Sequence, residues 1–489
     1  MSSLLRGGRL RTANKNVTNF ISSFEDDRRI ARSVILVNQA HVIALTKAQV
    51  ISRHKARRIL KALRQLEGQR IPKRGLEDVH VFIEESVING TGLDIGGLLN
   101  LGKSRNDQVT TAVRMTLREE ILELSDNLLS LAEAMLSLAQ KHTETVFPGY
   151  THLQPAQPIS FAHYLVANVD SLLRNSYRII EAYHRINCSP MGAAALAGTS
   201  FRLNRDLIAS LLGFNGLMEI SLDAVGSRDF LLETLCVCSL IASDLSRIAQ
   251  DLIFYSSAES SLIALPDEFA STSSIMPHKK NPDPLELVRA KCARIAGNPS
   301  VASTILHGLP SGYNLDFQEI TPLSWQSIDE LKSCLRIMTE LIPKIEVDKE
   351  IALRQYLEFT AATEIANVLV REEGTPFRLA HRVVGSAVRT ALQQSKTLKS
   401  LSRKDWEGHL HRRIKPRTVS LMERALNLKT HLWTYQTKGS PNPREMRNVI
   451  LRRKRECAAM REESSQLHQS IRKRLEALST AASGISGTA

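Results

Sequence analysis

Apolar side chains recur every three or four residues along most of the chain, which is the spacing of helices that bury one face. The clearest run predicts one very long helix over residues 106–142. Pro148, Gly149, Pro155 and Pro158 mark the region where this helix has ended. Its apolar positions are Val109, Val113, Leu117, Ile121, Leu124, Leu128, Leu131, Met135 and Leu138.

The same spacing predicts two further long helices, over residues 159–187 and 230–256. The second of these is apolar around much of its circumference, which is typical of a helix in a bundle core or at a subunit interface. Two more helices are expected at 283–298 and 324–347. The fold class is therefore predicted to be all-α.

Shorter helical patterns with polar joints flank this central region. Three precede it, at residues 29–45, at 47–67 and after Glu77. At the other end, a charged helix is expected from Arg444 to about Leu478, followed by a Ser/Ala/Gly tail that is predicted to be disordered. The predicted domains are an N-terminal helical lobe (1–105), a central long-helix bundle (106–350), a C-terminal helical lobe (351–443) and a basic helical extension with a disordered tail (444–489).

The composition fits a large helical protein with a basic surface. Of its 489 residues, 43% are apolar and only 5% are aromatic, and 64 lysines and arginines outnumber 50 acids to give a formal charge of +14. The basic runs at residues 53–61 and 452–455 are interpreted first as solvated helix faces. A nucleic acid, a membrane surface or an anionic substrate stays open as a partner, although no nucleic-acid motif accompanies the charge.

Six scattered cysteines form no CxxC pair and have no histidine at zinc-ligand spacing. Neither a disulfide framework nor a zinc site is therefore indicated. No hydrophobic leader opens the chain, and no stretch approaches the roughly 20 apolar residues that span a bilayer. These features predict a cytoplasmic protein without a membrane partner.

Polar segments interrupt the helical pattern at a few places, and these are the candidate sites. Residues 102–108 begin the longest helix, where Ser104, Asn106 or Asp107 could be simple caps, but where backbone N–H groups beside Arg105 also suit a carboxylate. Residues 149–158 concentrate hydroxyl, imidazole and amide groups between prolines. Thr151 and His152 could be structural, as a lone histidine more often is, or could bind or catalyse.

Two later segments complete the set. Residues 271–282 crowd hydroxyls and cations, which suits a solvated loop as well as a site. In a site, Lys279 is near enough in sequence to stabilise an activated serine. Residues 313–319, with 227–229 upstream, could be ordinary turns with capping side chains or parts of a site. Taken alone, residues 313–319 and residues 227–229 are each weak evidence for a site.

Several of these segments together resemble a known family. Residues 273–282 are similar to the signature loop Ser-Ser-x-Met-Pro-x-Lys-x-Asn-Pro of the fumarase/aspartase superfamily. The segments 104–109 and 150–164 narrow the resemblance to argininosuccinate lyases. So do residues 222–225 with 228–230, and residues 281–287. The likeness extends from Gly7 to Pro443.

The resemblance implies a fold of three helical lobes. The middle lobe would be a bundle of five long helices, which combines with three further copies into the twenty-helix core of a homotetramer. Active sites in such proteins form where three different subunits meet. The implied reaction is the cleavage of argininosuccinate to arginine and fumarate in arginine biosynthesis, with no cofactor and no metal.

The resemblance also assigns roles to individual residues. Ser273 would be the general base, and Lys279 would stabilise the negative charge that forms. His152, oriented by Glu286, would be the candidate proton donor to the departing nitrogen. The implied substrate-binding residues are Ser104, Arg105, Asn106, Thr151, Asn281, Tyr313, Gln318, Arg228 and Asn38.

The chain departs from the family pattern near these positions. Asn38 stands where the family has a substrate serine, Asn100 where it has a histidine, and Lys103 where it has an arginine. Leu315 and Thr321 replace basic residues. These departures bear on the substrate more than on the fold.

Three alternatives stay open at this stage. The first is a related lyase that releases fumarate from adenylosuccinate, aspartate or malate. The second is a non-catalytic protein on the same scaffold, as in lens crystallins. The third is binding of nucleic acid by the basic C-terminal helix, residues 444–475.

Overall fold

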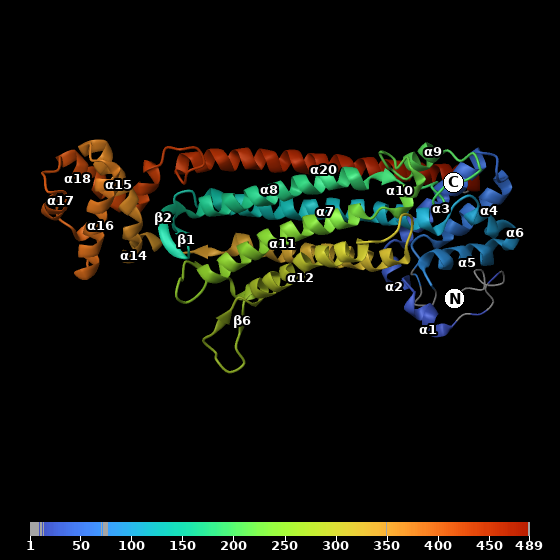
Figure 1. Ribbon diagram of the computed structural model, residues 1–489, viewed down its shortest axis with the longest axis horizontal. Coiled ribbons are helices and arrows are strands. Elements are labelled where there is room, and N and C mark those ends of the chain that lie inside the picture. Colours follow the sequence, from blue (N-terminus) through green and yellow to red (C-terminus); the bar gives the residue numbers. More distant parts are fainter. Residues whose placement is uncertain are drawn as a thin grey trace.

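The computed structural model describes residues 9, 12, 14–69, 71, 77–348 and 350–487. Gly7 and Gly8, where the family resemblance begins, lie outside the described residues. Figure 1 shows a long bundle of helices with a small helical lobe at each end. The all-α prediction with three helical lobes is confirmed.

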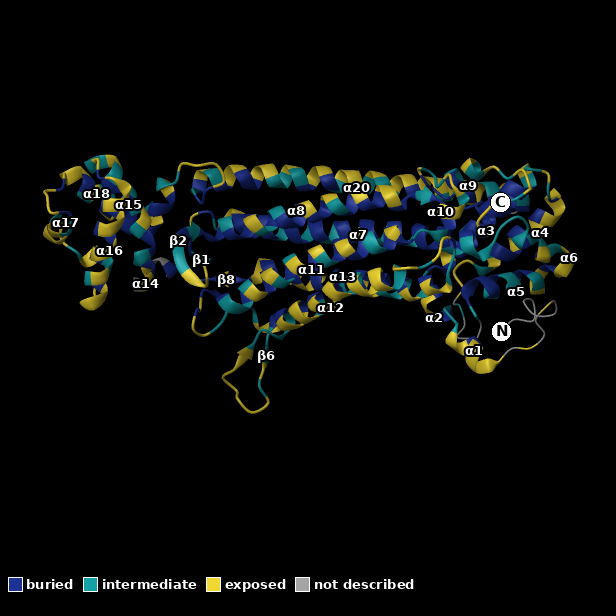
Figure 2. Ribbon diagram, viewed as in Figure 1, coloured by how far each residue is buried: buried dark blue, intermediate teal, exposed yellow. Residues whose placement is uncertain are grey.

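The bundle is built from the helices that the apolar spacing predicts. The longest, α7, runs for 37 residues, and its apolar stripe is buried from Val113 to Leu138. In Figure 2 the buried positions follow α7 and α8 through the middle of the bundle. The five predicted long helices are α7 (Arg105–Lys141), α8 (Phe161–Ile186), α11 (Asp229–Tyr255), α12 (Asp283–Leu306) and α13 (Ile320–Leu341).

A sixth long helix, α20 (Pro443–Ser486), runs back along α7 and α8 from one lobe to the other (Figure 1). Ion pairs hold it there: Arg453 binds Asp170 at 2.6 Å, and Arg461 binds Glu133 at 3.0 Å. The C-terminal extension that the sequence set apart is thus packed along the bundle.

The predicted disorder of the tail is wrong over residues 479–487. Helix α20 continues to Ser486, because Leu478, Ala482 and Ser486 form a buried face toward the N-terminal lobe. The side chain of Arg53 in that lobe donates to the carbonyl oxygen of Gly484 at 2.9 Å. Packing against α3 and α4 therefore orders this segment, which its sequence pattern alone did not indicate.

Short helices form the two end lobes and the joints of the bundle. The N-terminal lobe contains α1 (Lys15–Phe20), α2 (Phe24–Asp27), α3 (Ala31–Lys47), α4 (Arg53–Leu66), α5 (Val79–Thr91), α6 (Leu93–Gly96) and a 3-10 turn at Gly97–Asn100. Between α8 and α11 lie α9 (Arg205–Leu211) and α10 (Ser221–Gly226). The C-terminal lobe contains α14 (Gln355–Glu358), α15 (Ala362–Glu373), α16 (Phe377–Gln393), α17 (Arg403–Leu410), α18 (Pro416–Leu426) and α19 (Leu428–His431).

Short strands pair in twos at the joints, and 3-10 turns connect some of the remaining elements. The antiparallel pairs are β1 (Val146–Thr151) with β2 (Gln154–Ser160), β5 (Ile263–Ala264) with β8 (Glu346–Val347), and β6 (Ser271–Thr272) with β7 (Lys280–Asn281); β3 (Cys188–Ser189) and β4 (Gly216–Leu217) are parallel. The 3-10 turns are Asp267–Phe269, Leu315–Glu319, Ile342–Lys344, Ile351–Leu353, Phe359–Ala361, Leu398–Ser400 and Leu432–Thr434.

Several predicted helix ends are corrected by the structure. Helix α4 begins at Arg53 and not at residue 47, because Gln49 adopts a left-handed backbone (φ 58°) that separates it from α3. Helix α12 passes through Pro299 and ends at Leu306, where it buries one more turn at Ala302. Helix α13 occupies residues 320–341, since a 3-10 turn and β8 take the last predicted residues.

Candidate active site

Polar residues of the turn before α7 cap the N-terminus of that helix. The Ser104 hydroxyl accepts the backbone N–H of Asn106 at 3.3 Å, and the Asp107 carboxylate accepts the backbone N–H of Ser104 at 3.0 Å. The other oxygen of Asp107 accepts the backbone N–H groups of Gly192 and Ala194, at 3.1 and 2.9 Å. Ser104 and Asp107 therefore have the capping role that the sequence left open.

Arg105 faces two acids that stand at the start of α5. Its guanidinium donates to Asp78 Oδ2 at 2.5 Å and to Glu77 Oε1 at 3.4 Å. Asp78 also caps α5, because its Oδ1 accepts the backbone N–H of Val81 at 2.7 Å. Neither acid was predicted as a site residue, although an acid directly before an apolar helical run is a recognisable capping signal.

Arg228 lies buried against two aromatic rings. Its Nη1 donates to the carbonyl oxygens of Val225 and Ser227, at 3.2 and 2.6 Å. Its guanidinium carbon lies 4.3 Å from the ring centre of Phe317 and 5.8 Å from that of Tyr313. Burial lowers the pKa of Arg228 to about 10, so the side chain keeps its charge at neutral pH.

These groups gather at one end of the bundle. Burial raises the pKa of Tyr313, and the charges of Arg228, Asp27, Asp78 and Arg105 all act on its hydroxyl. Because electrostatic interactions of this kind weaken with distance, the five residues form one polar cluster. The structure thus brings together candidates from three predicted segments.

Two amides from the predicted site stand at the same end of the bundle. Asn106 Nδ2 donates to the carbonyl oxygen of Ala195 at 3.0 Å, and Gln318 Nε2 donates to that of Ile21 at 3.3 Å. Both side chains are only partly buried. They therefore lie where they can exchange a backbone carbonyl for a ligand carboxylate.

Residues 271–282 form a loop that projects from the side of the bundle at β6 (Figure 1). Pairing of β6 with β7 closes the base of the loop, where Ser271 also bonds to Asp283. Lys280 anchors the same base by donating to the carbonyl oxygen of Leu265 at 2.5 Å and to Asp267 at 2.6 Å. Asn281, in β7, is partly buried at this base.

The hydroxyl of Ser273 accepts hydrogen bonds from two backbone N–H groups within this loop. The backbone N–H groups of Ile275 and Met276 point at its Oγ, at 3.3 and 3.2 Å. The turn closes at Lys279, whose backbone N–H donates to Met276 O at 3.1 Å, and the Lys279 side chain is exposed. Two N–H dipoles aimed at one oxygen favour its negatively charged form.

Thr151 and His152 are exposed at the tip of the β1–β2 hairpin, which the sequence analysis expected to be a loop. His152 and Leu153 form the two-residue turn and have φ of 54° and 56°. Two left-handed residues are what a tight hairpin turn of this type demands, and they are usually Asn or Gly. A histidine held there is a strained position, which is a mark of functional sites.

Glu286 lies in the first turn of α12 and is exposed. It follows the projecting loop directly in sequence. No bond between Glu286 and His152 is found among the described residues of a single chain.

The long helices show how far apart these groups are in one chain. Ser104 caps one end of α7 and the hairpin follows the other end, so the 37 residues between them separate Ser104 from Thr151 and His152 by roughly 55 Å. Helix α12, with 24 residues, separates the projecting loop from Tyr313 and Gln318 by roughly 36 Å. One chain therefore holds the predicted residues in three separate groups.

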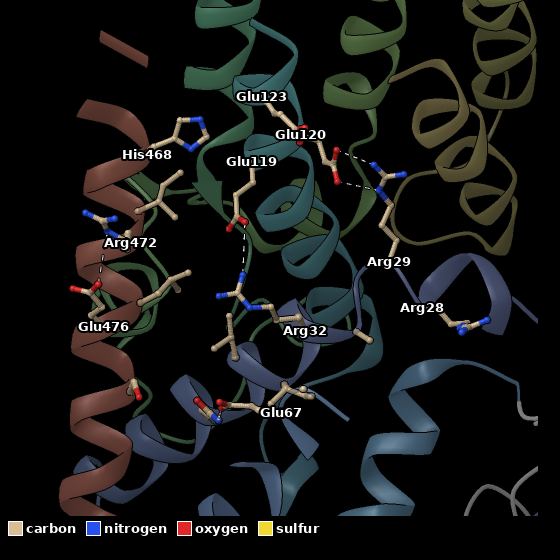
Figure 3. Close-up of a pocket in the computed structure, with 18 of the residues that line it drawn as sticks. Arg28, Arg29, Arg32, Glu67, Glu119, Glu120, Glu123, His468, Arg472 and Glu476 are labelled. Atoms are coloured by element: carbon tan, nitrogen blue, oxygen red, sulfur yellow. Dashed lines mark hydrogen bonds and ion pairs between the residues drawn. The ribbon is translucent and has the colours of Figure 1, made fainter. Parts of the chain in front are cut away.

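A large cavity of about 1800 Å³ lies elsewhere, between the N-terminal lobe, α7 and α20. Figure 3 shows that its walls carry charged side chains, many of which already pair with one another, such as Arg29 with Glu120 and Arg32 with Glu119. None of the residues predicted for the active site lines it. We assign this cavity no part in the chemistry.

Two family models match the chain. One, described as lyase, matches residues 8–297, and the other, described as argininosuccinate lyase C-terminal, matches residues 359–430. The argininosuccinate lyase of Methanosarcina acetivorans is 40% identical over 484 residues, which cover 98% of both chains. That of Methanothrix thermoacetophila is 41% identical over 481 residues, 97% of this chain and 98% of the relative. The chain belongs to the argininosuccinate lyase family.

Solved structures agree with this membership. EDDS lyase in complex with formate is 28% identical and superposes with a TM-score of 0.87, over 94% of this chain and 92% of that one. The class II fumarase of Schistosoma mansoni, at 19% identity, shares the fold, with a TM-score of 0.70 over 81% of this chain and 90% of that one. The argininosuccinate lyase family resemblance inferred from the sequence is thus confirmed.

Proposed function

We propose that this protein cleaves argininosuccinate to arginine and fumarate, as a cytoplasmic enzyme of arginine biosynthesis. The observation that carries the proposal is the likeness to argininosuccinate lyases over nearly the whole length of both chains. The geometry of the Ser273 loop supports it, because a carbon–nitrogen lyase needs a base strong enough to remove a carbon-bound proton.

Ser273 is the proposed base. An ordinary serine is far too weak a base at neutral pH, and the backbone N–H groups of Ile275 and Met276 supply part of the stabilisation that an alkoxide needs. The alkoxide takes a proton from the carbon next to the one that bears the departing nitrogen. The electron pair that is released first resides on the adjacent carboxylate.

Lys279 and Asn281 are proposed to hold that negative charge. Both belong to the same loop as Ser273, and a fixed ammonium next to the reacting carboxylate lowers the energy of the doubly negative intermediate. The intermediate then expels the guanidino nitrogen as the new carbon–carbon double bond forms. The products are fumarate and, once the nitrogen gains a proton, arginine.

His152 is the proposed source of that proton, with Glu286 as the group that orients it. An imidazole has one ring nitrogen that can donate a proton and one that can accept a proton. The strained turn at the hairpin tip supports a functional role, since a structural turn would be more stable with Asn or Gly. Thr151, beside it, is proposed to bind the substrate.

The polar cluster at the other end of the bundle is proposed to bind the carboxylates of the substrate. Arg105 and Asn106 stand at the N-terminus of α7, where helix N–H groups favour an anion. Ser104, Tyr313 and Gln318 add hydroxyl and amide donors. Arg228 would contribute its charge from beneath the Tyr313 and Phe317 rings.

The separations within one chain support the proposal of a homotetramer whose active sites are shared between copies. Groups that lie roughly 36 to 55 Å apart cannot act on one small substrate, so the proposed sites combine segments of different copies. Helices α11 and α12 present exposed apolar side chains that a soluble monomer would not need, among them Leu240, Leu287 and Val301. In Figure 2 the outer face of α12 is largely exposed.

Release of fumarate by the purified protein, followed by its ultraviolet absorbance, tests the reaction. We expect activity with argininosuccinate and a loss of roughly 10²- to 10⁴-fold in Ser273→Ala, the usual contribution of a general base. Ser274→Ala is the matched control, because this neighbouring hydroxyl is exposed and should change the rate little. Faster release from adenylosuccinate, aspartate or malate would overturn the substrate assignment.

A further inference from the structure

Asn38 lies on the buried face of α3, beside the turn that leads into α7. Its side chain is only 1% exposed. Its Nδ2 donates to the carbonyl oxygen of Val34 at 3.0 Å, and its Oδ1 accepts the ammonium of Lys103 at 2.5 Å. Both ends of the amide are therefore already used within the protein.

His41 holds the same turn from the next position on that face of α3. Its Nε2 lies 2.8 Å from the carbonyl oxygen of Leu101. Burial lowers the pKa of His41 to about 3, so the ring is neutral and its Nε2–H can donate to the carbonyl. Since Asn38 and His41 are three residues apart on one helix, they contact residues 101 and 103 from a single surface.

The turn is also enclosed on its other side. Gly102 has φ 74°, and a Cβ added there would meet the side chains of Phe201 at 3.1 Å and Thr199 at 3.3 Å. Residues 101–103 are thus held between α3 and the loop that contains Phe201. Because Ser104, Arg105 and Asn106 follow without a break, the position of this turn sets the position of all three.

We infer that Asn38 is a positioning residue that, through Lys103, fixes the Ser104–Asn106 segment for binding a substrate carboxylate. This inference rests on the proposed function and deepens it. It replaces the direct substrate contact that the family resemblance implied for Asn38. In this arrangement Asn38 and Lys103 act as one unit.

The surroundings of Lys103 make a neutral acceptor at position 38 important. The ionisable groups that face it are His41 from α3, His80 and Glu84 from α5, and Asp107 from α7. Burial lowers the pKa of Lys103 to about 8, while the charges of Asp107 and Glu84 oppose that shift. The ammonium is therefore mostly retained at neutral pH, and the Asn38 amide determines where it sits.

Steady-state kinetics of Asn38→Leu tests the inference. This change keeps the size of the side chain and removes the acceptor for Lys103, so we expect KM for argininosuccinate to rise roughly 10-fold, the lower end for a charged hydrogen bond. The value of kcat should stay close to that of the parent, because the proposed base Ser273 lies on a different loop. Asn38→Gln, which keeps a neutral acceptor for Lys103, should restore KM.

Gln39→Leu is the matched control. Gln39 is the next residue of α3, is also 1% exposed, and binds Glu67 on another side of the helix. Loss of this amide removes a buried hydrogen bond without touching the turn. Its KM should therefore equal that of the parent, whatever its effect on thermal stability.

A double-mutant cycle shows whether Asn38 acts through Lys103. Lys103→Met should raise KM by itself, and it probes the same bond from a less buried side chain if Asn38→Leu fails to fold. The double variant should be no worse than Lys103→Met. An unchanged KM in Asn38→Leu, or effects that multiply in the double variant, would overturn the inference, whereas a parent protein that releases no fumarate would overturn the proposed function itself.

Discussion

His152 and Leu153 occupy a backbone region that residues with a Cβ enter at a cost of about 1 kcal/mol or more each. Both are exposed at the hairpin tip, so packing does not explain their presence. The strain is consistent with a turn kept in one shape so that the imidazole is held in a fixed place. This interpretation separates the two residues, because a chemical role is proposed only for His152.

Glycine substitution separates strain from chemistry at this turn. His152→Gly should leave thermal stability equal or slightly higher, because glycine adopts a positive φ freely, while fumarate release falls by roughly 10²-fold with the loss of the imidazole. Leu153→Gly relieves the same backbone and should keep the activity. Equal losses of activity in both variants would show that turn rigidity, and not the imidazole, is what the reaction needs.

Asp126 connects α7 to α20 through its side chain. It accepts the Ser464 hydroxyl at 3.0 Å and lies 3.4 Å from His468 Nε2. Burial would raise the pKa of Asp126, yet the bonds to His468 and Ser464, with the charges of His468 and Arg461, lower it below its usual value. A carboxyl with a lowered pKa in the folded state stabilises that state above its unfolded pKa and loses this effect as the pH falls through its folded pKa.

Asp126→Asn should therefore lower the free energy of unfolding at neutral pH by about 0.5 kcal/mol, as for a partly exposed ion pair, and lower the thermal midpoint only slightly. The difference from the parent should narrow as the pH is lowered toward about 4 and below, where the parent carboxylate also takes up a proton. Thermal unfolding of both proteins across this range measures it. A gap that widened at low pH would contradict the assignment.

At the scale of elements, helix existence followed from the apolar spacing, whereas some ends and pairings did not. The stripe and the cap at Ser104 predict α7 almost to the residue. The β1–β2 hairpin was missed because its prolines resemble a loop, although Pro148 and Pro158 pair with each other at its edge. A Ser/Ala tail does not indicate by itself that α4 will cover it.

The site shows the same division between local and distant information. The polar segments could be found from the sequence, since each interrupts a helical pattern. The contact of Arg105 with Asp78 and the bond between Lys103 and Asn38 join residues 27 and 65 positions apart. Periodicity carries no information on such pairs, so the role of Asn38 became clear only from the structure.

The end of α20 that packs against the N-terminal lobe should contribute to the stability of the fold. Ala482 is fully buried, on the segment where Arg53 and Arg64 of α4 reach Gly484 and Ser486. Ala482→Lys should lower the thermal midpoint by several degrees, since it places a charge in an apolar contact beside two arginines. Ala477→Lys, at an exposed position of the same helix, is the control and should have little effect. Equal midpoints for both variants would show that this end of α20 does not hold the N-terminal lobe.

For the whole molecule, the basic residues of α20 and the exposed apolar side chains of α11 and α12 lead to different conclusions. Arg453 and Arg461 of α20 pair with acids of α8 and α7, which supports the interpretation of this helix as part of the fold. Among the described residues, no helix is long and apolar enough to cross a membrane. The unpartnered apolar side chains of α11 and α12 are instead available to further copies of the chain.

One active site is proposed to combine residues from more than one copy of the chain. Ser273→Ala removes the proposed base. Asn106→Asp places a repelling charge at the proposed site of a substrate carboxylate, at a helix N-terminus that tolerates an acid. Each variant alone should be inactive. The two residues are separated in one chain by about the length of α12.

Fumarate release by a hybrid of these two variants, co-expressed with different tags and purified through both, tests the claim most directly. We expect the hybrid to regain a substantial part of the parent activity, because some sites then combine an intact Asn106 from one copy with an intact Ser273 from another. A doubly tagged hybrid as inactive as its two parents would place both residues in a site made by a single chain, and would contradict the account.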